Sequence, residues 1–299
     1  MSLAVVHHPD YRAPVPPGHR FPMPKYGYLR QYLLERGLLV EDHRHRPEPV
    51  PPETAALAHD PSYVARAFSL ELRDEEVRRI GLPQTARVIL RSRLAVAGTL
   101  LAAKVALRRG LACNAAGGSH HAGPEGGAGY CVMNDVSVAI RGLHAERPGL
   151  RALVIDCDVH QGDGTALTFA ADRRVTTFSI HAERNFPFEK ARSDLDISLP
   201  DGTGDEGYLR ALRRGLSALG AAGPFDLIFY NAGVDVHADD RLGRLRLSDA
   251  GIRARDAAVL GWARPLAPVV GVLGGGYGDD PSAIAARHLI LFEEAAKLA

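Results

Sequence analysis

The segment 153–164 reads LVIDCDVHQGDG and places three aspartates and one histidine directly after an apolar run. A buried strand rarely ends in so many charges unless something there neutralises them. In an extended strand, residues two apart share a face, so we expect Asp156, Asp158 and His160 to point the same way. Carboxylates and an imidazole directed at one point make part of a metal site, and catalytic zinc commonly takes three protein ligands.

The third ligand must come from elsewhere in the chain. Asp235 ends the segment NAGVD and is the obvious candidate. A lone aspartate is more often a helix N-cap or one half of a loop salt bridge. Taken together, Asp158, His160 and Asp235 favour a metal site.

Two adjacent histidines, His120 and His121, lie in the glycine-rich segment GGSHHAG. A single histidine is more often structural than catalytic, but two in a row in such a loop are hard to explain as packing. Each would need a partner that orients its ring, and Asp156 and Asp163 are the spare carboxylates. We therefore interpret the pair as a general base and a general acid that act on a metal-activated water.

Two further glycine-rich motifs can contribute to a site. GGGY, residues 274–277, would deliver the Tyr277 phenol, which can donate a hydrogen bond to a developing oxyanion. Alone this motif is weak, because glycine-rich turns before tyrosine are common. We interpret GGAGYCVMND, residues 126–135, as part of the wall of the site, with Gly129 and Tyr130 lining a narrow channel.

Alternating strand-like and helix-like segments must position these residues. Short apolar runs predict strands over 111–116, 152–157, 174–181, 226–230 and 268–273. Helical patterns open at Thr85, Asp205 and Ser248, and the first two end at Gly110 and Gly220. We expect Asn134 and Asp135 to cap a further helix.

This alternation predicts one α/β domain over residues 1–299, with a parallel sheet and helices on both of its faces. Parallel α/β sheets carry their sites at the carboxyl ends of the strands. Four motifs each follow a predicted strand: GGSHHAG from residue 117, DCDVHQGDG from 156, NAGVD from 231 and GGGY from 274. We therefore expect four strand ends to converge on one rim.

The composition narrows the class of protein. The chain has 299 residues, 46% of them hydrophobic, and a net charge of +1, which argues against general affinity for nucleic acid or membrane surfaces. Three cysteines without a CxxC pair give no disulfide framework. We find no signal-peptide pattern and no long apolar run, so we expect a cytoplasmic protein without a membrane span. The proline-rich segments 14–24 and 47–52 are expected to be surface loops.

Four motifs, in their order along the chain, resemble the histone deacetylase family of zinc-dependent amidohydrolases. They are GGSHHAGPEGGAGYCVMND, DCDVHQGDG, NAGVDVHADDRLG and GGGY. The resemblance runs from about HDPSYV, at residue 59, to the C-terminal helix. VHQGDG, NAGVD and DRLGRLRLS are most similar to class IV members and their bacterial relatives. The resemblance implies an arginase-like, three-layer α/β/α fold with a mainly parallel sheet.

The resemblance also implies a role for each candidate residue. Zinc, or alternatively iron(II), would be held by Asp158, His160 and Asp235. His120 would pair with Asp156 and His121 with Asp163, and His121 would act as general base and as general acid for the leaving amine. Tyr277 would polarise the scissile carbonyl.

Further positions follow from the same resemblance. A structural or modulatory potassium ion would be bound near Asp156 by Asp158, His160, Ser179 and Ile180. A second, peripheral cation site would involve Phe169 and Val175. The substrate channel would be lined by Gly129, Tyr130, Phe186 and Gly275.

The sequence departs from the family pattern at the rim of this channel. Segment 78–85, RRIGLPQT, lacks the acidic residue with which many members grip a peptide backbone, and Tyr130 stands where many have Phe. The long insertion of the dimeric polyamine deacetylases is also missing. Acyl-lysine peptides or proteins, with acetyl or longer chains, and small acylated amines are all compatible substrates. The alternative functions are a small-molecule amidohydrolase of the acetylpolyamine type, a binuclear manganese ureohydrolase and a non-catalytic metal-binding protein. The sequence leaves the oligomeric state open.

Overall fold

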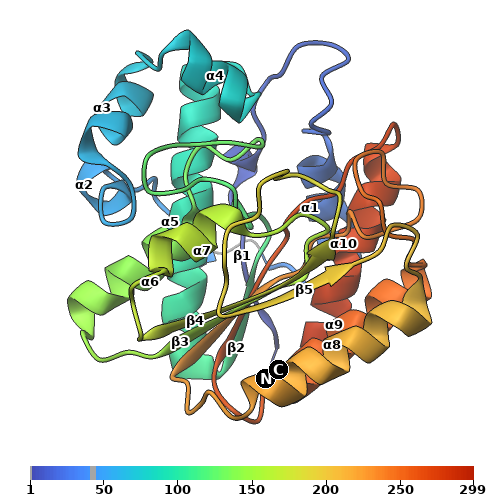
Figure 1. Ribbon diagram of the computed structural model, residues 1–299. Helices are drawn as coiled ribbons and strands as arrows, with labels where there is room; N and C mark the ends of the chain where they lie inside the picture. The colour runs from blue at the N-terminus through green and yellow to red at the C-terminus, as the bar shows by residue number, and fades with distance from the viewer. Residues whose placement is uncertain (1, 41–44) are drawn as a thin grey trace.

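A single parallel sheet of seven strands forms the centre of the computed structural model, which describes residues 2–40 and 45–299 (Figure 1). Across the sheet the strands follow the order β1-β2-β7-β6-β3-β4-β5. Their bounds are β1 Ala4–Val6, β2 Leu111–Asn114, β3 Ala152–Asp156, β4 Val175–Ala182, β5 Leu195–Leu199, β6 Leu227–Asn231 and β7 Val269–Val272.

The predicted parallel sheet is confirmed, and the five predicted strands correspond to β2, β3, β4, β6 and β7. The two edge strands were not predicted. β1 contains three residues, too few to show a periodic pattern, and β5 is partly exposed with the mixed sequence LDISL. Edge strands of this kind carry less of the apolar signal from which buried strands are recognised.

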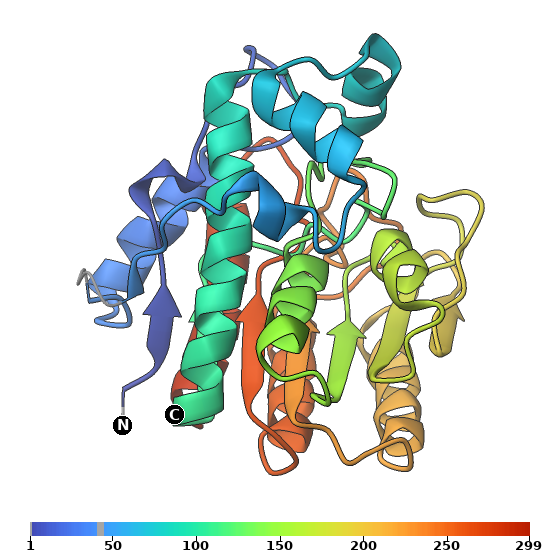
Figure 2. The same ribbon diagram turned by 90° about the vertical axis from the view of Figure 1, so that its left-hand side faces the viewer.

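Helices cover both faces of the sheet, as predicted (Figures 1 and 2). One layer contains α5 (Ala86–Arg109), α6 (Asp135–Glu146) and α7 (Asp163–Phe169). The other contains α1 (Lys25–Glu35), α8 (Asp205–Leu219), α9 (Asp249–Ala263) and α10 (Pro281–Ala296). Three short helices, α2 (Pro52–Ala55), α3 (Pro61–Ser69) and α4 (Asp74–Ile80), and the turn η1 (Pro9–Tyr11) complete the described chain.

The two apolar layers of the core reflect the alternation of side chains along the strands. On β3, Ala152 and Val154 pack towards the α5 and α6 side, whereas Leu153 and Ile155 pack in the cluster that includes α8, α9 and α10. All four side chains are buried. The three-layer arrangement therefore follows from apolar residues on both faces of a central strand.

The predicted helix ends are largely those observed. Thr85 caps α5 by accepting a hydrogen bond from the Val88 amide, and Gly110 ends that helix with φ of +87°. Asn134 caps α6 and Ser248 caps α9. α8 begins at Asp205, as expected, but its N-cap is Gly204. Within the described residues we find no helix with both the length and the apolar character needed to cross a bilayer.

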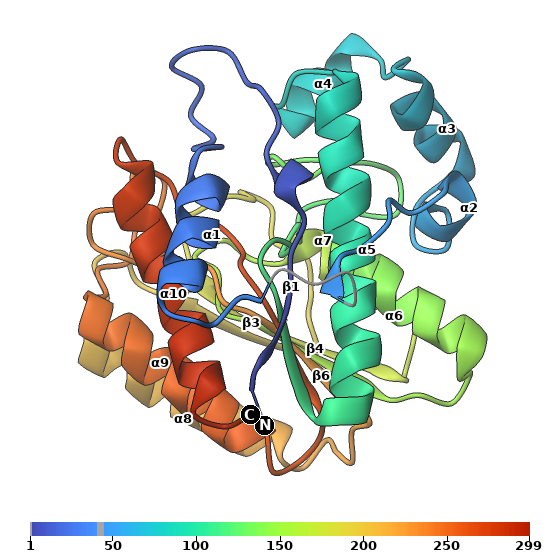
Figure 3. The same cartoon turned by 180° about the vertical axis from the view of Figure 1, so that it is seen from behind.

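The order of the strands reverses between β3 and β6. From β3 the chain moves outwards to β4 and β5, whereas from β6 it moves to β7 on the other side. Such a switch point opens a crevice at the carboxyl ends of the two strands. β1 begins and α10 ends at the opposite end of the sheet, away from this crevice (Figure 3).

Candidate active site and metal centre

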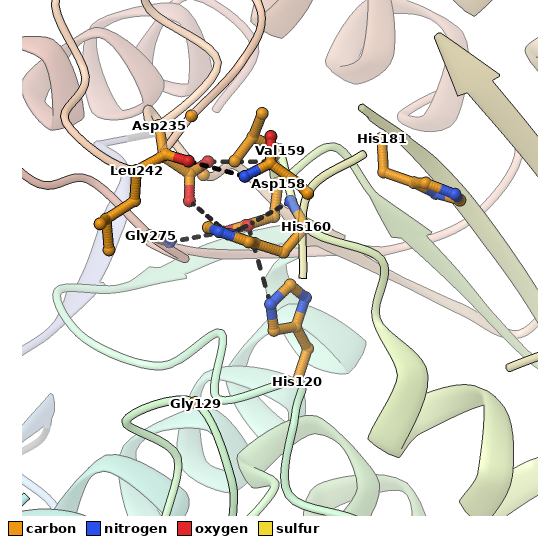
Figure 4. Close-up of polar contacts among 12 residues, drawn as sticks. His120, Gly129, Asp158, Val159, His160, His181, Asp235, Leu242 and Gly275 are labelled. Carbon is orange, nitrogen blue, oxygen red and sulfur yellow. Dashed lines mark hydrogen bonds and ion pairs between the residues drawn. The ribbon is translucent and has the colours of Figure 1, made fainter. Parts of the chain in front are cut away.

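Three buried side chains meet at the switch point. Asp158 and His160 follow β3, and Asp235 follows the neighbouring strand β6. His160 Nδ1 lies 3.0 Å from Asp158 Oδ1 and 3.2 Å from Asp235 Oδ2 (Figure 4). One ligand atom from each residue lies within 4.8 Å of the others, and all three residues are buried. We call this group the metal triad, because its donor atoms could hold a metal ion.

The triad is not built on one strand face, and that expectation from the sequence is wrong. β3 ends at Asp156, and the chain then turns so that the Asp158 carboxylate accepts the His160 amide at 3.0 Å. Asp156 itself points at His120 and accepts the Asp158 amide at 3.1 Å. Hydrogen bonds from the amides of Asp158 and His160 to aspartate side chains hold this turn.

Glycines provide the space for the triad. A Cβ added to Gly275 would lie 2.0 Å from Asp235 Oδ2, and one added to Gly233 would lie 2.4 Å from Asp158 Oδ2. The Gly275 amide donates to Asp158 Oδ2 at 2.6 Å. Gly275, predicted to line the channel, thus lies at the metal triad itself.

The electrostatics of the triad fit a divalent cation. Burial and the neighbouring Asp158 carboxylate raise the pKa of Asp235 to about 7. Burial opposes a charge on His160, but hydrogen bonds to Asp158 and Asp235 raise its pKa to about 10. Two buried carboxylates need a cation to balance them, and a donor set of two oxygens and one imidazole nitrogen suits zinc or iron.

The two adjacent histidines each bind a carboxylate. His120 Nδ1 lies 2.7 Å from Asp156 Oδ2, and His121 Nδ1 lies 2.6 Å from Asp163 Oδ1. Their Nε2 atoms lie 3.1 Å apart, and His120 Nε2 is 3.7 Å from Asp158 Oδ1. The pair therefore lies directly beside the metal triad.

The two histidines have opposite protonation preferences. Burial disfavours the charged form of His120, but Asp156 and Asp158 outweigh it and raise the pKa to about 9. Burial, together with the charge of His120, lowers the pKa of His121 to about 4. Neutral His121 can accept a proton while charged His120 stabilises negative charge nearby.

Asp135 holds the backbone in front of the histidine pair. Its carboxylate accepts the amides of Gly118 and Ser119, at 3.2 and 2.7 Å, and the Thr99 hydroxyl at 2.6 Å. Asp135 is fully buried at the first turn of α6. Sequence reasoning assigned it a capping role, whereas the structure gives it the larger task of fixing the loop before His120.

Tyr277 follows β7 and its side chain is buried in the described structure. Its ring lies against those of Tyr130 and His160, with centroid distances of 5.7 and 6.2 Å. Burial, followed by the charge of Asp158, raises the pKa of Tyr277 well above its ordinary value. The phenol therefore stays protonated and remains a hydrogen-bond donor.

The predicted channel residues surround His121 and Tyr277. The Phe186 ring packs edge-on against His121 at 4.8 Å, and a Cβ on Gly129 would lie 2.5 Å from the same imidazole. Gly129 has φ of +53°, so a side chain there would also be strained. Tyr130 covers Tyr277 from the other side.

Segment 14–24 also reaches the site, which was not expected. It was predicted to be a surface loop, but Phe21 and Met23 are buried, and the Phe21 ring lies 6.3 Å from that of Tyr277. With residues such as Leu242 and Tyr277, the segment lines a groove of about 690 Å³. The alternating apolar residues of FPMPKY were the signal for this burial.

The residues predicted to bind monovalent cations lie on neighbouring elements. Asp156 and Ser179 are register partners on β3 and β4, and Ile180 follows on β4. Ser179 Oγ lies 2.9 Å from His181 Nδ1, and His181 lies apart from the metal triad in Figure 4. Phe169 ends α7 and Val175 begins β4. Binding of potassium by these positions stays a prediction.

Asn231 is a site residue that sequence reasoning missed. It is the last residue of β6, and its Nδ2 donates to Asp156 Oδ1 at 3.0 Å. It thereby fixes the carboxylate that orients His120. The motif NAGVD contains Asn231, but its place beside Asp156 depends on the pairing of β3 with β6.

Comparison with known proteins identifies a family for the chain. The family described as the histone deacetylase domain matches residues 19–291. An uncharacterized protein of Picosynechococcus is 45% identical over 296 residues, which cover 99% of each chain. Histone deacetylase 2 of Arabidopsis thaliana is 31% identical over 282 residues, covering 91% of this chain and 73% of that protein.

Solved structures show the same fold. The crystal structure of a histone deacetylase homologue from Aquifex aeolicus aligns with a TM-score of 0.83 and 23% identity. The alignment covers 99% of this chain and 84% of that chain. The three-layer fold with a parallel sheet, expected from the sequence, is thus confirmed.

Proposed function

The chain belongs to the histone deacetylase domain family, and we propose that it is a zinc-dependent deacylase. The proposed reaction removes an acetyl or longer acyl group from an N-acyl lysine or a related amine. The observation that carries the proposal is the buried metal triad with two carboxylate-paired histidines and Tyr277 at its side. The side chains that would carry out amide hydrolysis follow neighbouring strands at one end of the sheet.

Asp158, His160 and Asp235 would hold the metal ion. Bound zinc would supply Lewis acidity, which lowers the pKa of a water and polarises a carbonyl. Among the residues that the structure describes, one group of this composition is found. This supports a single catalytic metal rather than the binuclear manganese centre of a ureohydrolase.

His121 is suited to move the proton. Its Nδ1 lies 2.6 Å from Asp163, which would keep a proton on that nitrogen. Its Nε2, which lies 3.1 Å from His120 Nε2, would then take a proton from the attacking water. A new C–O bond forms as the water attacks the acyl carbon. The proton on His121 then passes to the amine nitrogen as the C–N bond breaks, which releases a carboxylic acid and an amine.

Tyr277 and His120 are suited to stabilise charge. The phenol of Tyr277, kept protonated by its burial, would donate a hydrogen bond to the developing oxyanion. A proton on His120, favoured by its contact with Asp156, would add positive charge beside the same site. A potassium ion at Asp156 and Ser179 would add to this stabilisation.

A small acylated amine is a second candidate substrate. Segment 78–85 packs against the channel, because the Tyr130 amide donates to the Ile80 carbonyl at 2.7 Å. This segment offers no carboxylate with which to grip a peptide backbone. Peptides and small amines therefore belong in the same assay.

The test is hydrolysis by the zinc-loaded protein of lysine peptides with acetyl, octanoyl and myristoyl groups, and of acetylated polyamines. We expect turnover of at least one, and Tyr277→Phe should retain zinc while kcat falls by roughly 10²–10³. Rates that rise with chain length would identify a long-chain deacylase. Absence of turnover on every substrate, with zinc bound, would contradict the proposal and favour a non-catalytic metal-binding protein.

A further inference from the structure

The peptide bond that precedes Tyr277 is held at both of its polar ends. At one end, the Gly276 carbonyl accepts a hydrogen bond from Lys25 Nζ at 3.2 Å. At the other end, the Tyr277 amide donates to Asp240 Oδ2 at 2.6 Å. The Lys25 ammonium thus lies at the negative, carbonyl end of this peptide dipole. The Asp240 carboxylate lies at its positive, amide end.

Lys25 is an unusual buried cation. It is the first residue of α1 and 1% exposed, and the described residues provide no carboxylate partner for it. Its Nζ lies 5.5 Å from the ring centroids of Phe21 and Tyr26 and 5.7 Å from that of Tyr277. Burial of an ammonium group costs free energy unless other groups stabilise its charge. Here the three aromatic rings and the Gly276 carbonyl stabilise it.

Asp240 fixes the other side of the same peptide. It lies in the loop between β6 and α9, and its second carboxylate oxygen accepts the amides of Leu242 and Gly243 at 2.8 and 2.9 Å. This turn makes the carboxylate rigid. The Tyr277 amide is therefore bound by a carboxylate whose position is set by two further hydrogen bonds.

The motif GGGY needs such an external restraint. Gly276 has φ of +156°, and a Cβ there would lie 2.6 Å from Val234 Cγ2 and 2.9 Å from Ile284 Cγ2. Glycine is thus required, and glycine leaves the backbone with the greatest rotational freedom. Rotation of this peptide would move the Tyr277 ring away from the metal triad.

We propose that Lys25 and Asp240 form a charge clamp that positions the Tyr277 hydroxyl for catalysis. The clamp consists of Lys25 Nζ, the Gly276–Tyr277 peptide and the Asp240 carboxylate. This inference rests on the oxyanion role proposed above for Tyr277. Lys25 and Asp240 are positioning residues, since each acts through the backbone of Tyr277.

The first test is a comparison of kcat in two backgrounds. In the wild-type background, Lys25→Met and Asp240→Asn should each lower kcat by roughly 10–100-fold with little change in KM. Lys25→Arg, which keeps a cation, should restore part of the loss. In the Tyr277→Phe background the same substitutions should change kcat less than about 2-fold, because the group they position is already gone.

The control is Lys104→Met, which removes a partly exposed lysine on α5 that pairs with Glu146. It should leave kcat unchanged. Zinc content is measured for every variant, so that loss of metal is separated from loss of positioning. If Lys25→Met does not fold, Asp240→Asn provides the same comparison. Equal losses of kcat in both backgrounds would overturn the clamp.

A second readout does not depend on activity. Amide hydrogen exchange of the fragment covering residues 273–280 should be faster in Lys25→Met and Asp240→Asn than in the wild type and Lys104→Met. Unchanged exchange in both clamp variants would contradict the proposal. A wild-type protein without turnover but with this exchange pattern would leave the clamp standing and reject the deacylase function.

Discussion

The division of labour between His120 and His121 arises from neighbouring charges rather than from a difference in side chain. His120 is near two aspartates, Asp156 and Asp158, whereas His121 has one partner, Asp163, and faces the charge of His120. Both rings are buried, so these small differences in surroundings act with little screening. These neighbouring charges raise the pKa of His120 and lower the pKa of His121.

At this scale, His121→Ala should lower kcat by roughly 10²–10⁴, because the proton acceptor is lost. Asp163→Asn should lower it by roughly 10–100-fold, since the orienting carboxylate is lost but the imidazole remains. Zinc content should not change in either variant, and kcat with metal analysis measures both effects. Asp226→Asn, at the amino end of β6, is the matched control. A kcat for His121→Ala within a few-fold of wild type would rule out the assigned role.

At the scale of elements, the short helix α4 supports the channel wall. The carbonyls of Arg79 and Ile80, at its end, accept the amides of Gly129 and Tyr130 at 3.1 and 2.7 Å. Glu76 holds the start of this helix. Its carboxylate accepts the Arg73 amide at 2.8 Å and pairs with Arg66 at 2.6 Å.

This arrangement predicts a pH-dependent contribution to stability. The hydrogen bond from Arg66 is the main cause that lowers the pKa of Glu76 from 4.5 to about 2. The contribution is therefore fully present above pH 4.5 and is lost as the pH falls towards 2. Glu76→Gln should lower the free energy of unfolding at pH 7 by about 1–2 kcal/mol, because the partly exposed Arg66 and Arg73 are screened by solvent.

The measurement is denaturant unfolding of the wild type and Glu76→Gln at pH 7 and pH 3. The difference in free energy between the two proteins should shrink at the lower pH. A difference that stays the same at both pH values would show that Glu76 contributes through packing and not through its charge.

The elements also show what the sequence can and cannot predict. The buried strands, the caps at Thr85, Asn134 and Ser248, and the parallel sheet follow from apolar periodicity and capping residues. The metal triad residues were identified by residue type. The turn after Asp156 was not, because it is held by hydrogen bonds from the amides of Asp158 and His160 to aspartate side chains, which apolar periodicity does not report.

Long-range contacts account for the other omissions. Lys25 and Phe21 precede Tyr277 by about 250 residues, and Asn231 reaches Asp156 across two paired strands. Nothing in a single sequence reports such proximity. The proline-rich segment 14–24 is a loop, as predicted, but Phe21 and Met23 within it are buried and the Phe21 ring lies against Tyr277.

At the scale of the whole molecule, the fold gathers the chemistry at one end of the sheet. The adjacent strands β2, β7, β6 and β3 deliver, in turn, the histidine pair, Tyr277, Asp235, and Asp158 with His160. The reversal of strand order between β6 and β3 opens the crevice in which the triad lies. We propose that this end of the sheet forms a hydrolytic centre with one metal ion.

The measurement that tests this claim most directly is a zinc titration of the metal-free protein, followed by the rate of hydrolysis of its best acyl-lysine peptide. We expect the rate to rise linearly and to reach a plateau at one equivalent of zinc per chain. A plateau at two equivalents would indicate a binuclear centre. One tightly bound zinc without any hydrolysis would contradict the account of this site as a deacylase.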